Sequence, residues 1–380
     1  MTGPISHSSE SDGPLILFAG GGTGGHLSPG LAVAEEFRRR LGSVRIAFVG
    51  SGREIERRMI EPAGYPLETT CMPSSLDLRR QPLRSLSRGW SAWRTAHQQL
   101  KANRPHLIVG LGGFASFPAC LAARSHGIPL ALLEQNVVPG RSVRFLARRA
   151  GLVCGSFEET AVALRASQNY VVTGNPVRSA IAGLHSRAGS SDDRQTLLIL
   201  GGSQGAESLN TAVLGLLGRG VLQRWGGPIV HQTGLADEAR VREGYANAGV
   251  AATVSAFIDD LQPHYDAAAL AIARAGATTL AELACAGCPA ILLPYPHAAD
   301  NHQLRNAQWY ARQGAAIVVE QITSADATAA HLASAWEPLS ANPGQRITMR
   351  LAMARTARPD AASAVVETLL NRLWGTGPVS

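Results

Sequence analysis

The chain has 380 residues, of which 45% are hydrophobic and 17% are charged. This composition supplies enough apolar material for two cores and too little charge for a disordered protein, so we expect two globular domains. No run of about eighteen apolar residues occurs, which argues against a membrane-spanning helix. The start of the chain is polar and lacks a basic, apolar leader, and we therefore expect no signal peptide.

The net charge of +7 is unevenly distributed. Residues 1–180 carry 21 basic and 12 acidic side chains, whereas residues 181–380 carry 14 and 16. No acidic residue occurs between Asp77 and Glu134, and we expect this basic segment to bind an anionic partner. Its basic residues are Arg79, Arg80, Arg84, Arg88, Arg94, Lys101, Arg104 and Arg124.

Short apolar runs alternate with helical patterns in the first half, which is typical of a doubly wound parallel sheet. The runs cover residues 15–19, 44–49, 107–111, 130–133, 152–154 and 171–173. Helical patterns include residues 29–41 and 90–102. Ser28 and Pro29 predict the start of the first helix, as its cap and its first helical residue.

The second half repeats this scheme, with apolar runs at 196–200, 228–231, 253–257, 270–273, 290–293 and 315–319. A polar segment within residues 178–195 predicts the linker. We therefore expect a disordered tail at residues 1–13 and two Rossmann-like α/β domains, at 14–178 and 179–357, that face a cleft. The last helical pattern, 361–374, has one apolar face that must pack on another element.

A glycine-rich loop follows the first strand of each half, at residues 20–26 and 201–206. Glycines at the carboxyl end of a parallel strand let backbone N–H groups approach an anion, and the following helix adds its positive end. The sequence therefore predicts one phosphate-binding loop in each domain.

The first loop formally matches the GxGxxG pattern of dinucleotide-binding enzymes. Such enzymes hold the ribose with an acid at the end of the second strand, and residues 48–51 contain none. The loop at 110–116, followed by Glu134, is the remaining NAD-like feature, but it begins in the middle of the domain. These departures disfavour a dehydrogenase.

The sequence has neither a Gly-Lys-Ser/Thr phosphate loop nor an Asp-x-Asp pair. We therefore expect that the protein requires no cofactor. A nucleotide diphosphate would then be held by helix ends, hydroxyls and an arginine, with a divalent cation in a secondary role. Cys285 and Cys288 form a lone CxxC without further ligands, so we expect reduced thiols and no metal site.

Several polar residues follow predicted strands. Asn136 and Arg178 each lie just beyond an apolar run, and residues 294–303 form a loop rich in hydrogen-bonding side chains. Glu282 is the only carboxylate among small apolar residues, which favours a partner such as a ribose diol over a solvent-facing role.

An apolar stripe runs along residues 83–100 and is flanked by arginines; it consists of Leu83, Leu86, Trp90, Trp93, His97 and Leu100. Such a stripe either packs in a core or lies on an anionic bilayer surface, and both interpretations stay open.

Taken together, these motifs resemble the MurG family of peptidoglycan glycosyltransferases from about residue 15 to residue 374. The resemblance rests on segments 21–26, 112–114, 134–136, 174–178, 201–206, 257–260 and 301–303. It implies a GT-B fold in which a final helix, about 358–376, completes the first domain. It also implies inverting transfer of N-acetylglucosamine from UDP-N-acetylglucosamine to undecaprenyl-pyrophosphoryl-N-acetylmuramoyl-pentapeptide, by a peripheral protein on the cytoplasmic face of the membrane.

The resemblance also implies roles for single residues. Those that match donor-binding positions are Asn136, Arg178, Ser203, Ile258, Ala277, Thr278, Thr279, Glu282 and Gln303. Those that match the acceptor-diphosphate loops are Thr23, Gly24, Gly25 and Gly113. His26 has a suitable intrinsic pKa for the general base. Leu133 stands where the family often has histidine, so this chain lacks that imidazole.

Two other functions remain open at this point. An epimerase of UDP-N-acetylglucosamine on the same two-domain plan would turn over without a lipid acceptor. A non-enzymatic basic module for membranes or nucleic acid would explain the charge asymmetry, but it leaves Asn136, Glu282 and Gln303 without a role. We therefore expect the transferase, with no nucleic acid partner.

Overall fold

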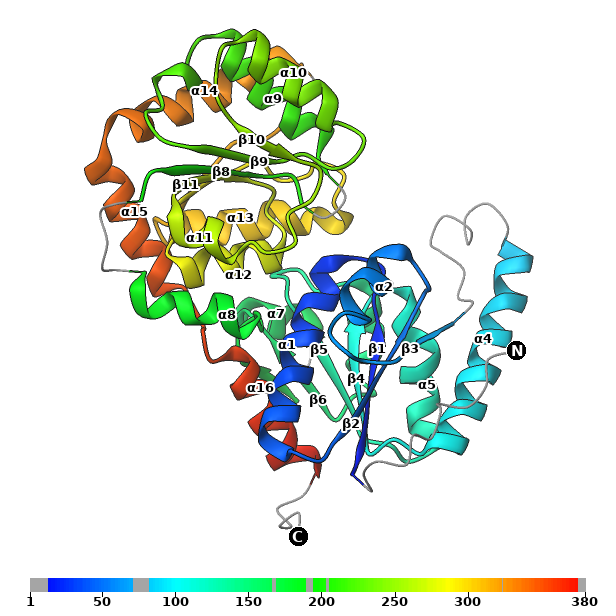
Figure 1. Cartoon of the computed structure of the whole chain (residues 1–380). Coiled ribbons are helices and arrows are strands. Elements are labelled where there is room, and N and C mark those ends of the chain that lie inside the picture. The colour runs from blue at the N-terminus through cyan, green and yellow to red at the C-terminus, as the bar shows by residue number, and fades with distance from the viewer. Residues whose placement is uncertain are drawn as a thin grey trace. The chain divides into compact units, whose positions relative to one another are not determined.

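The computed structural model describes residues 13–70, 82–165, 169–188, 194–202, 205–322 and 324–374, without the side chains of residues 82–86. The chain forms two compact units (Figure 1). Unit 1 comprises residues 1–178 and 360–380, and unit 2 comprises residues 179–359. The predicted tail lies outside the described residues except for Gly13, whose carbonyl accepts a hydrogen bond of 3.1 Å from Nε of Arg45.

Unit 1 is built on a parallel sheet in the order β3-β2-β1-β4-β5-β6-β7. Its strands are β1 (Leu15–Gly20), β2 (Arg45–Gly50), β3 (Leu67–Thr69), β4 (Leu107–Gly112), β5 (Leu130–Glu134), β6 (Leu152–Gly155) and β7 (Tyr170–Val172). Side chains alternate along β1, so that Leu15 and Leu17 enter one core while Ile16 and Phe18 enter the other. Both faces of the sheet are therefore buried, as in a doubly wound fold.

Helices cover the two faces of this sheet. One core contains residues of α1 (Gly24–Leu41), α2 (Glu54–Ile60) and α16 (Ala361–Leu369). The other contains residues of α4 (Pro82–Asn103), α5 (Phe117–Ser125), α6 (Arg141–Leu146) and α7 (Glu158–Leu164). Figure 1 shows α1 and α16 on one side of the sheet and α4 and α5 on the other. A 3-10 turn, Phe114–Ser116, precedes α5, and a π-helical turn, Leu370–Trp374, follows α16.

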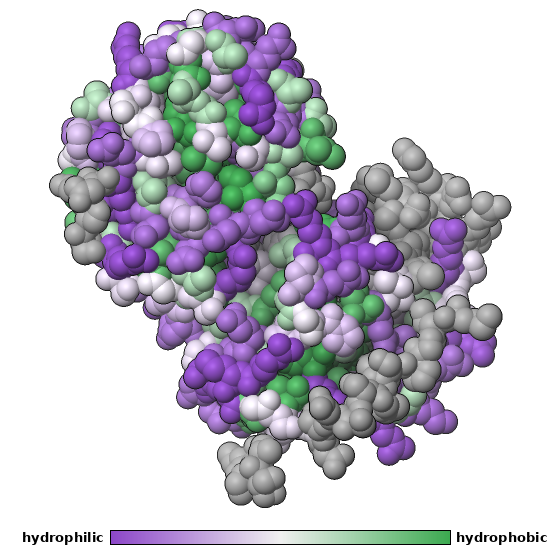
Figure 2. Space-filling model, viewed as in Figure 1, coloured by the Kyte–Doolittle hydropathy of each residue, from purple (hydrophilic) through white to green (hydrophobic). Residues whose placement is uncertain are grey.

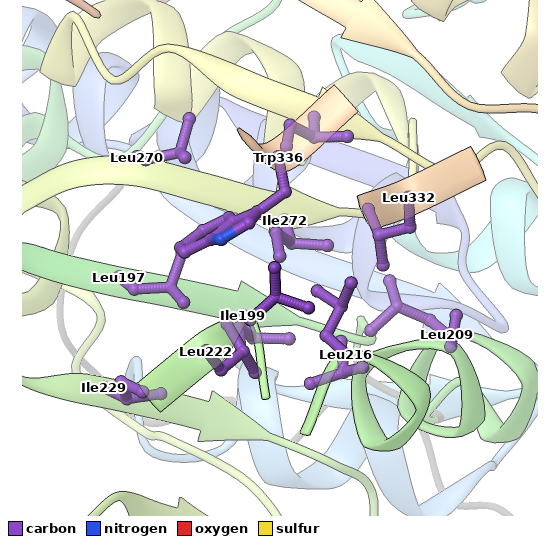
Figure 3. Close-up of a cluster of buried hydrophobic side chains, with 14 of the residues drawn as sticks. Leu197, Ile199, Leu209, Leu216, Leu222, Ile229, Leu270, Ile272, Leu332 and Trp336 are labelled. Carbon is purple, nitrogen blue, oxygen red and sulfur yellow. The ribbon is translucent and has the colours of Figure 1, made fainter. Parts of the chain in front are cut away.

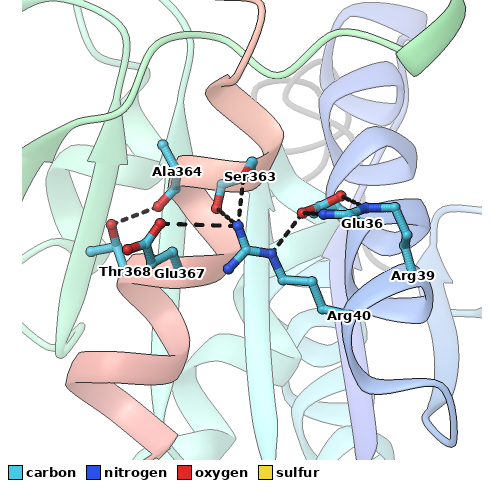
Figure 4. A network of polar contacts seen from close by, with 7 residues as sticks. All are labelled: Glu36, Arg39, Arg40, Ser363, Ala364, Glu367 and Thr368. Atoms are coloured by element: carbon cyan, nitrogen blue, oxygen red, sulfur yellow. Dashed lines mark hydrogen bonds and ion pairs between the residues drawn. The ribbon is translucent and has the colours of Figure 1, made fainter.

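Helix α16 returns to unit 1 after the chain has passed through unit 2. Val365, Val366 and Leu369 are fully buried in the core that α1 also lines. Arg40 of α1 links the two helices (Figure 4): its Nη2 donates to Ser363 Oγ at 2.5 Å and its Nε donates to Glu36 at 2.7 Å. Apolar burial thus holds α16 to α1, and a polar network adds to it.

Unit 2 has a second parallel sheet, in the order β10-β9-β8-β11-β12-β13. Its strands are β8 (Thr196–Leu200), β9 (Ile229–Gln232), β10 (Thr253–Ser255), β11 (Ala268–Ala273), β12 (Ala290–Leu292) and β13 (Ala316–Val318). Its helices are α8 (Ser179–Ala182), α9 (Glu207–Gly218), α10 (Glu238–Asn247), α11 (Gln262–Ala267), α12 (Ala277–Ala286), α13 (His302–Arg312), α14 (Ala325–Ala341) and α15 (Pro343–Arg355). Short 3-10 turns cover Gly183–Arg187, Leu222–Arg224 and Ala299–Asn301.

The main core of unit 2 is centred on Trp336 of α14, which is fully buried. Figure 3 shows its indole among aliphatic side chains from β8, β11 and α9. In Figure 1, α9 and α14 lie on one side of this sheet and α11, α12 and α13 on the other. Both units are therefore doubly wound, and the fold class predicted from the sequence is confirmed.

Two local expectations are wrong, and one strand was missed. Helix α1 begins at Gly24, and Pro29 lies inside it, because the glycine loop itself enters the helix. The strand β3 was not predicted, since its three half-buried residues form no apolar run. The described part of the predicted linker is helical over residues 179–187, because Ile181 and Leu184 are buried against unit 2.

Candidate functional site

Two glycine loops meet at the carboxyl edge of the unit 1 sheet, because β1 and β4 are neighbours and Gly20 pairs with Gly112. The φ of Gly20 is +133°, and a Cβ there would lie 2.6 Å from the carbonyl oxygen of Gly112. Gly113 has a φ of +75°, and a Cβ there would lie 3.0 Å from the carbonyl oxygen of Gly21. Only glycine permits this approach, so the two loops form one continuous backbone surface.

His26 lies in the first turns of α1, beside this surface. Its Nδ1 is 3.1 Å from Thr23 Oγ1, and a Cβ on Gly112 would lie 3.5 Å from its Nε2. Gly24 and Gly25 lie in the first turn of α1, at the positive end of the helix dipole. The structure therefore brings together Thr23, Gly24, Gly25, His26 and Gly113, as the sequence predicts for one loop cluster.

A buried carboxylate that the sequence analysis missed holds the first loop. Glu56 is fully buried at the start of α2 and accepts hydrogen bonds from the backbone N–H of Gly22 (2.7 Å) and of Gly52 (2.6 Å). It also accepts from the Ser51 hydroxyl (2.8 Å), while Arg53 Nη1 donates to the Gly22 carbonyl (3.0 Å). The carboxylate thus binds the protein's own backbone and fixes the loop.

Glu134 has a similar role at the end of β5. One of its oxygens accepts from the backbone and side-chain amide of Asn136, at 3.0 and 3.1 Å, and the other accepts from the Gly140 N–H at 2.8 Å. Burial raises the pKa of this carboxyl above its usual range. Glu134 therefore supports the 136–140 loop and orients Asn136, and the NAD-like interpretation of this acid loses its basis.

The second glycine loop is held from the next strand of unit 2. Gln232, at the end of β9, donates from Nε2 to the Gly202 carbonyl (3.1 Å) and accepts at Oε1 from the Ile258 N–H (3.2 Å). Gly205 has a φ of +75°, and a Cβ there would lie 2.7 Å from the Thr233 carbonyl oxygen. One side chain thus links the glycine loop to the segment that contains Ile258. Ser203 lies outside the described residues.

Helix α12 begins at the same edge of the unit 2 sheet. Its N-cap residue is Gly276, and its first turn contains Ala277, Thr278 and Thr279. Glu282, on the second turn, is only 7% exposed, which rules out the solvent-facing alternative. The hydroxyl of fully buried Tyr265 donates to its Oε2 at 2.9 Å, so the carboxylate is held in one orientation.

Two side chains hold the loop after β12, and a third, Asn306, holds the loop after β11. Arg274 Nη1 donates to the carbonyl of Leu293 (2.9 Å), Gln303 Oε1 accepts from the Tyr295 N–H (3.0 Å), and Asn306 Nδ2 donates to the Ala275 carbonyl (3.3 Å). The predicted donor-binding residues of unit 2 that the structure describes therefore lie at the carboxyl edge of one sheet.

Arg274 also places a buried positive charge at this edge. Its Nη2 donates to Ser208 Oγ (2.5 Å) and to Gln321 Oε1 (3.2 Å), and it is 7% exposed. All of these acceptors, like the carbonyls of residues 293 and 294, are neutral oxygens. Burial lowers the pKa of Arg274 to about 10, so the guanidinium stays charged at neutral pH.

Two predicted donor residues, Asn136 and Arg178, belong to unit 1. Arg178 is half-buried and follows a buried stretch, residues 173–177. The CxxC thiols are buried, and burial raises the pKa of Cys288 to about 12, which suits an unreactive thiol. Within the described ranges, no group of three or more histidine, cysteine or acidic residues is placed to hold a metal ion.

Helix α4 presents an aromatic row on its outer surface. Trp90 is 63% exposed, and the rings of Trp90, Trp93 and His97 follow one another at 5.1 and 5.3 Å. The helix packs on the sheet mainly through Ala92, Ala96 and Leu100, so the predicted stripe only partly faces the core. Arg88, Arg94 and Lys101 are exposed on the same helix.

Comparisons with known proteins agree with this geometry. Residues 16–154 match the glycosyltransferase family 28 N-terminal domain, and residues 196–365 match the glycosyltransferase family 28 C-terminal domain. A relative from Geotalea uraniireducens is 40% identical over 364 residues, which cover 93% of this chain and 97% of the relative. One from Pseudomonas syringae pv. tomato is 38% identical and covers 95% and 99%.

Both relatives are named UDP-N-acetylglucosamine–N-acetylmuramyl-(pentapeptide) pyrophosphoryl-undecaprenol N-acetylglucosamine transferase. Among solved structures, MurG of Acinetobacter baumannii matches with a TM-score of 0.72 at 29% identity, covering 93% of this chain and 98% of that one. The UDP-GlcNAc 2-epimerase of Neisseria meningitidis matches with a TM-score of 0.65 at 14% identity. The similarity between this chain and the epimerase therefore shows a common fold and nothing more.

Proposed function

Because the chain belongs to glycosyltransferase family 28, we propose that it transfers N-acetylglucosamine from UDP-N-acetylglucosamine to undecaprenyl-pyrophosphoryl-N-acetylmuramoyl-pentapeptide, the lipid-linked acceptor of peptidoglycan synthesis. The observation that carries this conclusion is the similarity to transferases of that name, which spans 93% or more of this chain. The glycine loops add the chemistry that two diphosphate-containing substrates require.

We assign the donor to unit 2. The uracil hydrogen-bonds to the backbone carbonyl of Ile258, because the N–H of that residue already donates to Gln232. The ribose binds the carboxylate of Glu282, which Tyr265 orients. The diphosphate lies at the start of α12, where N–H groups of residues 277–279 and the helix dipole favour an anion, and the charge of Arg274 adds to this field. Gln303 contacts the sugar hydroxyls.

We assign the acceptor diphosphate to unit 1, at the surface formed by Thr23, Gly24, Gly25 and Gly113. The backbone N–H groups of this surface do not have to reorganise when an anion arrives, because Glu56 already fixes the loop. The basic character of the first 180 residues favours the same substrate.

The reaction is a single displacement with inversion. The acceptor hydroxyl attacks the anomeric carbon, the bond from that carbon to the UDP oxygen breaks, and UDP departs with the bonding electrons. The hydroxyl proton passes to Nε2 of His26. For this to happen Nδ1 carries the other ring proton and donates to Thr23 Oγ1, which lies 3.1 Å away.

One assay tests this function directly. The full chain is incubated with labelled UDP-N-acetylglucosamine and a water-soluble, short-chain analogue of the lipid acceptor. We expect a disaccharide product and free UDP, each formed only when both substrates are present. Turnover of UDP-N-acetylglucosamine without any acceptor-dependent product would contradict the proposal and would favour an epimerase.

His26→Ala should lower kcat by about 10²- to 10⁴-fold, because a general base typically contributes that factor. The KM for UDP-N-acetylglucosamine should change little, since the donor binds to unit 2. His331→Ala, at an exposed position on α14, is the matched control and should leave kcat unchanged. A His26→Ala enzyme with turnover within about tenfold of the parent would exclude base catalysis by this residue.

Glu282→Ala should raise the dissociation constant of UDP-N-acetylglucosamine by about tenfold or more, because hydrogen bonds to a charged group contribute about 1.5–3 kcal/mol each. Tyr265→Phe should have a smaller effect, since the carboxylate remains but loses its orienting hydroxyl. Glu320→Ala, an exposed acid of the same unit, is the control. Calorimetric titration measures the dissociation constants of the three variants. An unchanged dissociation constant for Glu282→Ala would refute ribose binding by this carboxylate.

We further propose that the chain binds peripherally to the cytoplasmic face of the cell membrane through α4. Exposed Trp90 and the neighbouring basic side chains support this assignment, because tryptophan suits the bilayer interface and basic residues suit anionic lipids. None of the described helices is both long and apolar enough to cross a bilayer.

The full chain should sediment with anionic vesicles, and the bound fraction should fall as salt is raised. Trp90→Ser should weaken this binding, whereas Leu235→Ser, at an 87% exposed position of unit 2, should not. Equal binding to neutral and anionic vesicles would contradict the electrostatic part of the proposal.

A further inference from the structure

Three phenylalanines form a second aromatic surface in unit 1, separate from α4. Phe114 and Phe145 are 40% and 48% exposed, which is unusual for such large apolar side chains. The rings of Phe114 and Phe117 are 6.2 Å apart, and those of Phe117 and Phe145 are 5.5 Å apart. We call Phe114, Phe117 and Phe145 the aromatic ladder.

The ladder begins at the proposed acceptor-diphosphate loop. Phe114 directly follows Gly113, Phe117 opens α5, and Phe145 lies on α6. Helix α6 lies close to the loop, because a Cβ on Gly112 would be 4.0 Å from Cγ2 of Val143. The ladder therefore leads from the anion-binding backbone to the exposed surface of unit 1.

A basic side chain lies against the outer end of the ladder. The guanidinium of Arg149 lies 4.4 Å from the centre of the Phe145 ring, and its Nη1 donates to the Phe145 carbonyl at 3.1 Å. The exposed arginines of this segment are Arg141, Arg144, Arg148 and Arg149. No acidic residue occurs in the sequence between Glu134 and Glu158. The exposed ring of Phe145 thus lies in a segment whose charged side chains are all basic.

We propose that the aromatic ladder binds the isoprenoid chain of the acceptor next to its diphosphate. This inference rests on the proposed function, which supplies a substrate whose apolar chain is bonded directly to a diphosphate. With the diphosphate at Gly113, the chain leaves the loop beside Phe114 and runs along Phe117 to Phe145. The rings remove the apolar surface of this isoprenoid chain from water.

The test uses the full chain, and inhibition is measured without membranes. Geranylgeranyl diphosphate and inorganic diphosphate are compared as inhibitors of transfer to the short-chain acceptor. Phe145→Ser should raise the inhibition constant of geranylgeranyl diphosphate about ten- to twentyfold, the effect of losing about two buried CH₂ groups, and should leave that of inorganic diphosphate within about twofold. Phe145→Leu should restore most of the inhibition, because it keeps an apolar side chain.

Val162→Ser, at an 81% exposed position in the same unit, is the control and should change neither constant. Equal changes for both inhibitors, or none, would overturn the proposal. So would a Phe145→Ser variant that loses only vesicle binding, because the ladder would then be a bilayer contact. If the parent chain fails to turn over the short-chain acceptor, the proposed function fails instead, and direct binding of geranylgeranyl diphosphate still tests the ladder.

Discussion

The loops at the carboxyl edges of both sheets depend on buried polar side chains that hold their backbone in place. Glu56 and Glu134 do this in unit 1, and Gln232 and Arg274 do it in unit 2. Each of these side chains hydrogen-bonds to backbone groups of a loop. These bonds reduce the number of conformations that the loop can adopt. A loop fixed in this way presents its N–H groups to an anion without the cost of reorganisation.

This constraint explains how one fold serves two substrates with diphosphates. The transfer creates negative charge on the departing UDP and requires a proton to leave the acceptor hydroxyl. We assign the first demand to the start of α12 and to the buried charge of Arg274, which donates to neutral oxygens. We assign the second to His26, whose ring position depends on Thr23 and on the absence of a side chain at Gly112. The rigid loops therefore serve binding and chemistry together.

The sequence predicted the fold well because strands buried on both faces appear as apolar runs. The short edge strand β3 was missed, because its residues are only half-buried. Glycine loops, His26 and Glu282 were recognised because they lie within local motifs. Glu56, Gln232 and Tyr265 were not, because each acts on a loop or side chain far away in the sequence: Glu56 contacts a residue 34 positions earlier. The start of α1 was misplaced for a local reason, since glycines favour loops in isolation but enter a helix here.

The central claim is that the second glycine loop and the start of α12 bind the sugar nucleotide, while the first loop is reserved for the acceptor. A crystal structure of the full chain with UDP-N-acetylglucosamine tests this most directly. The account predicts the uracil at Ile258, the ribose at Glu282 and the diphosphate at residues 277–279. A nucleotide bound instead against Gly20–Gly25, with the unit 2 edge unoccupied, would contradict it.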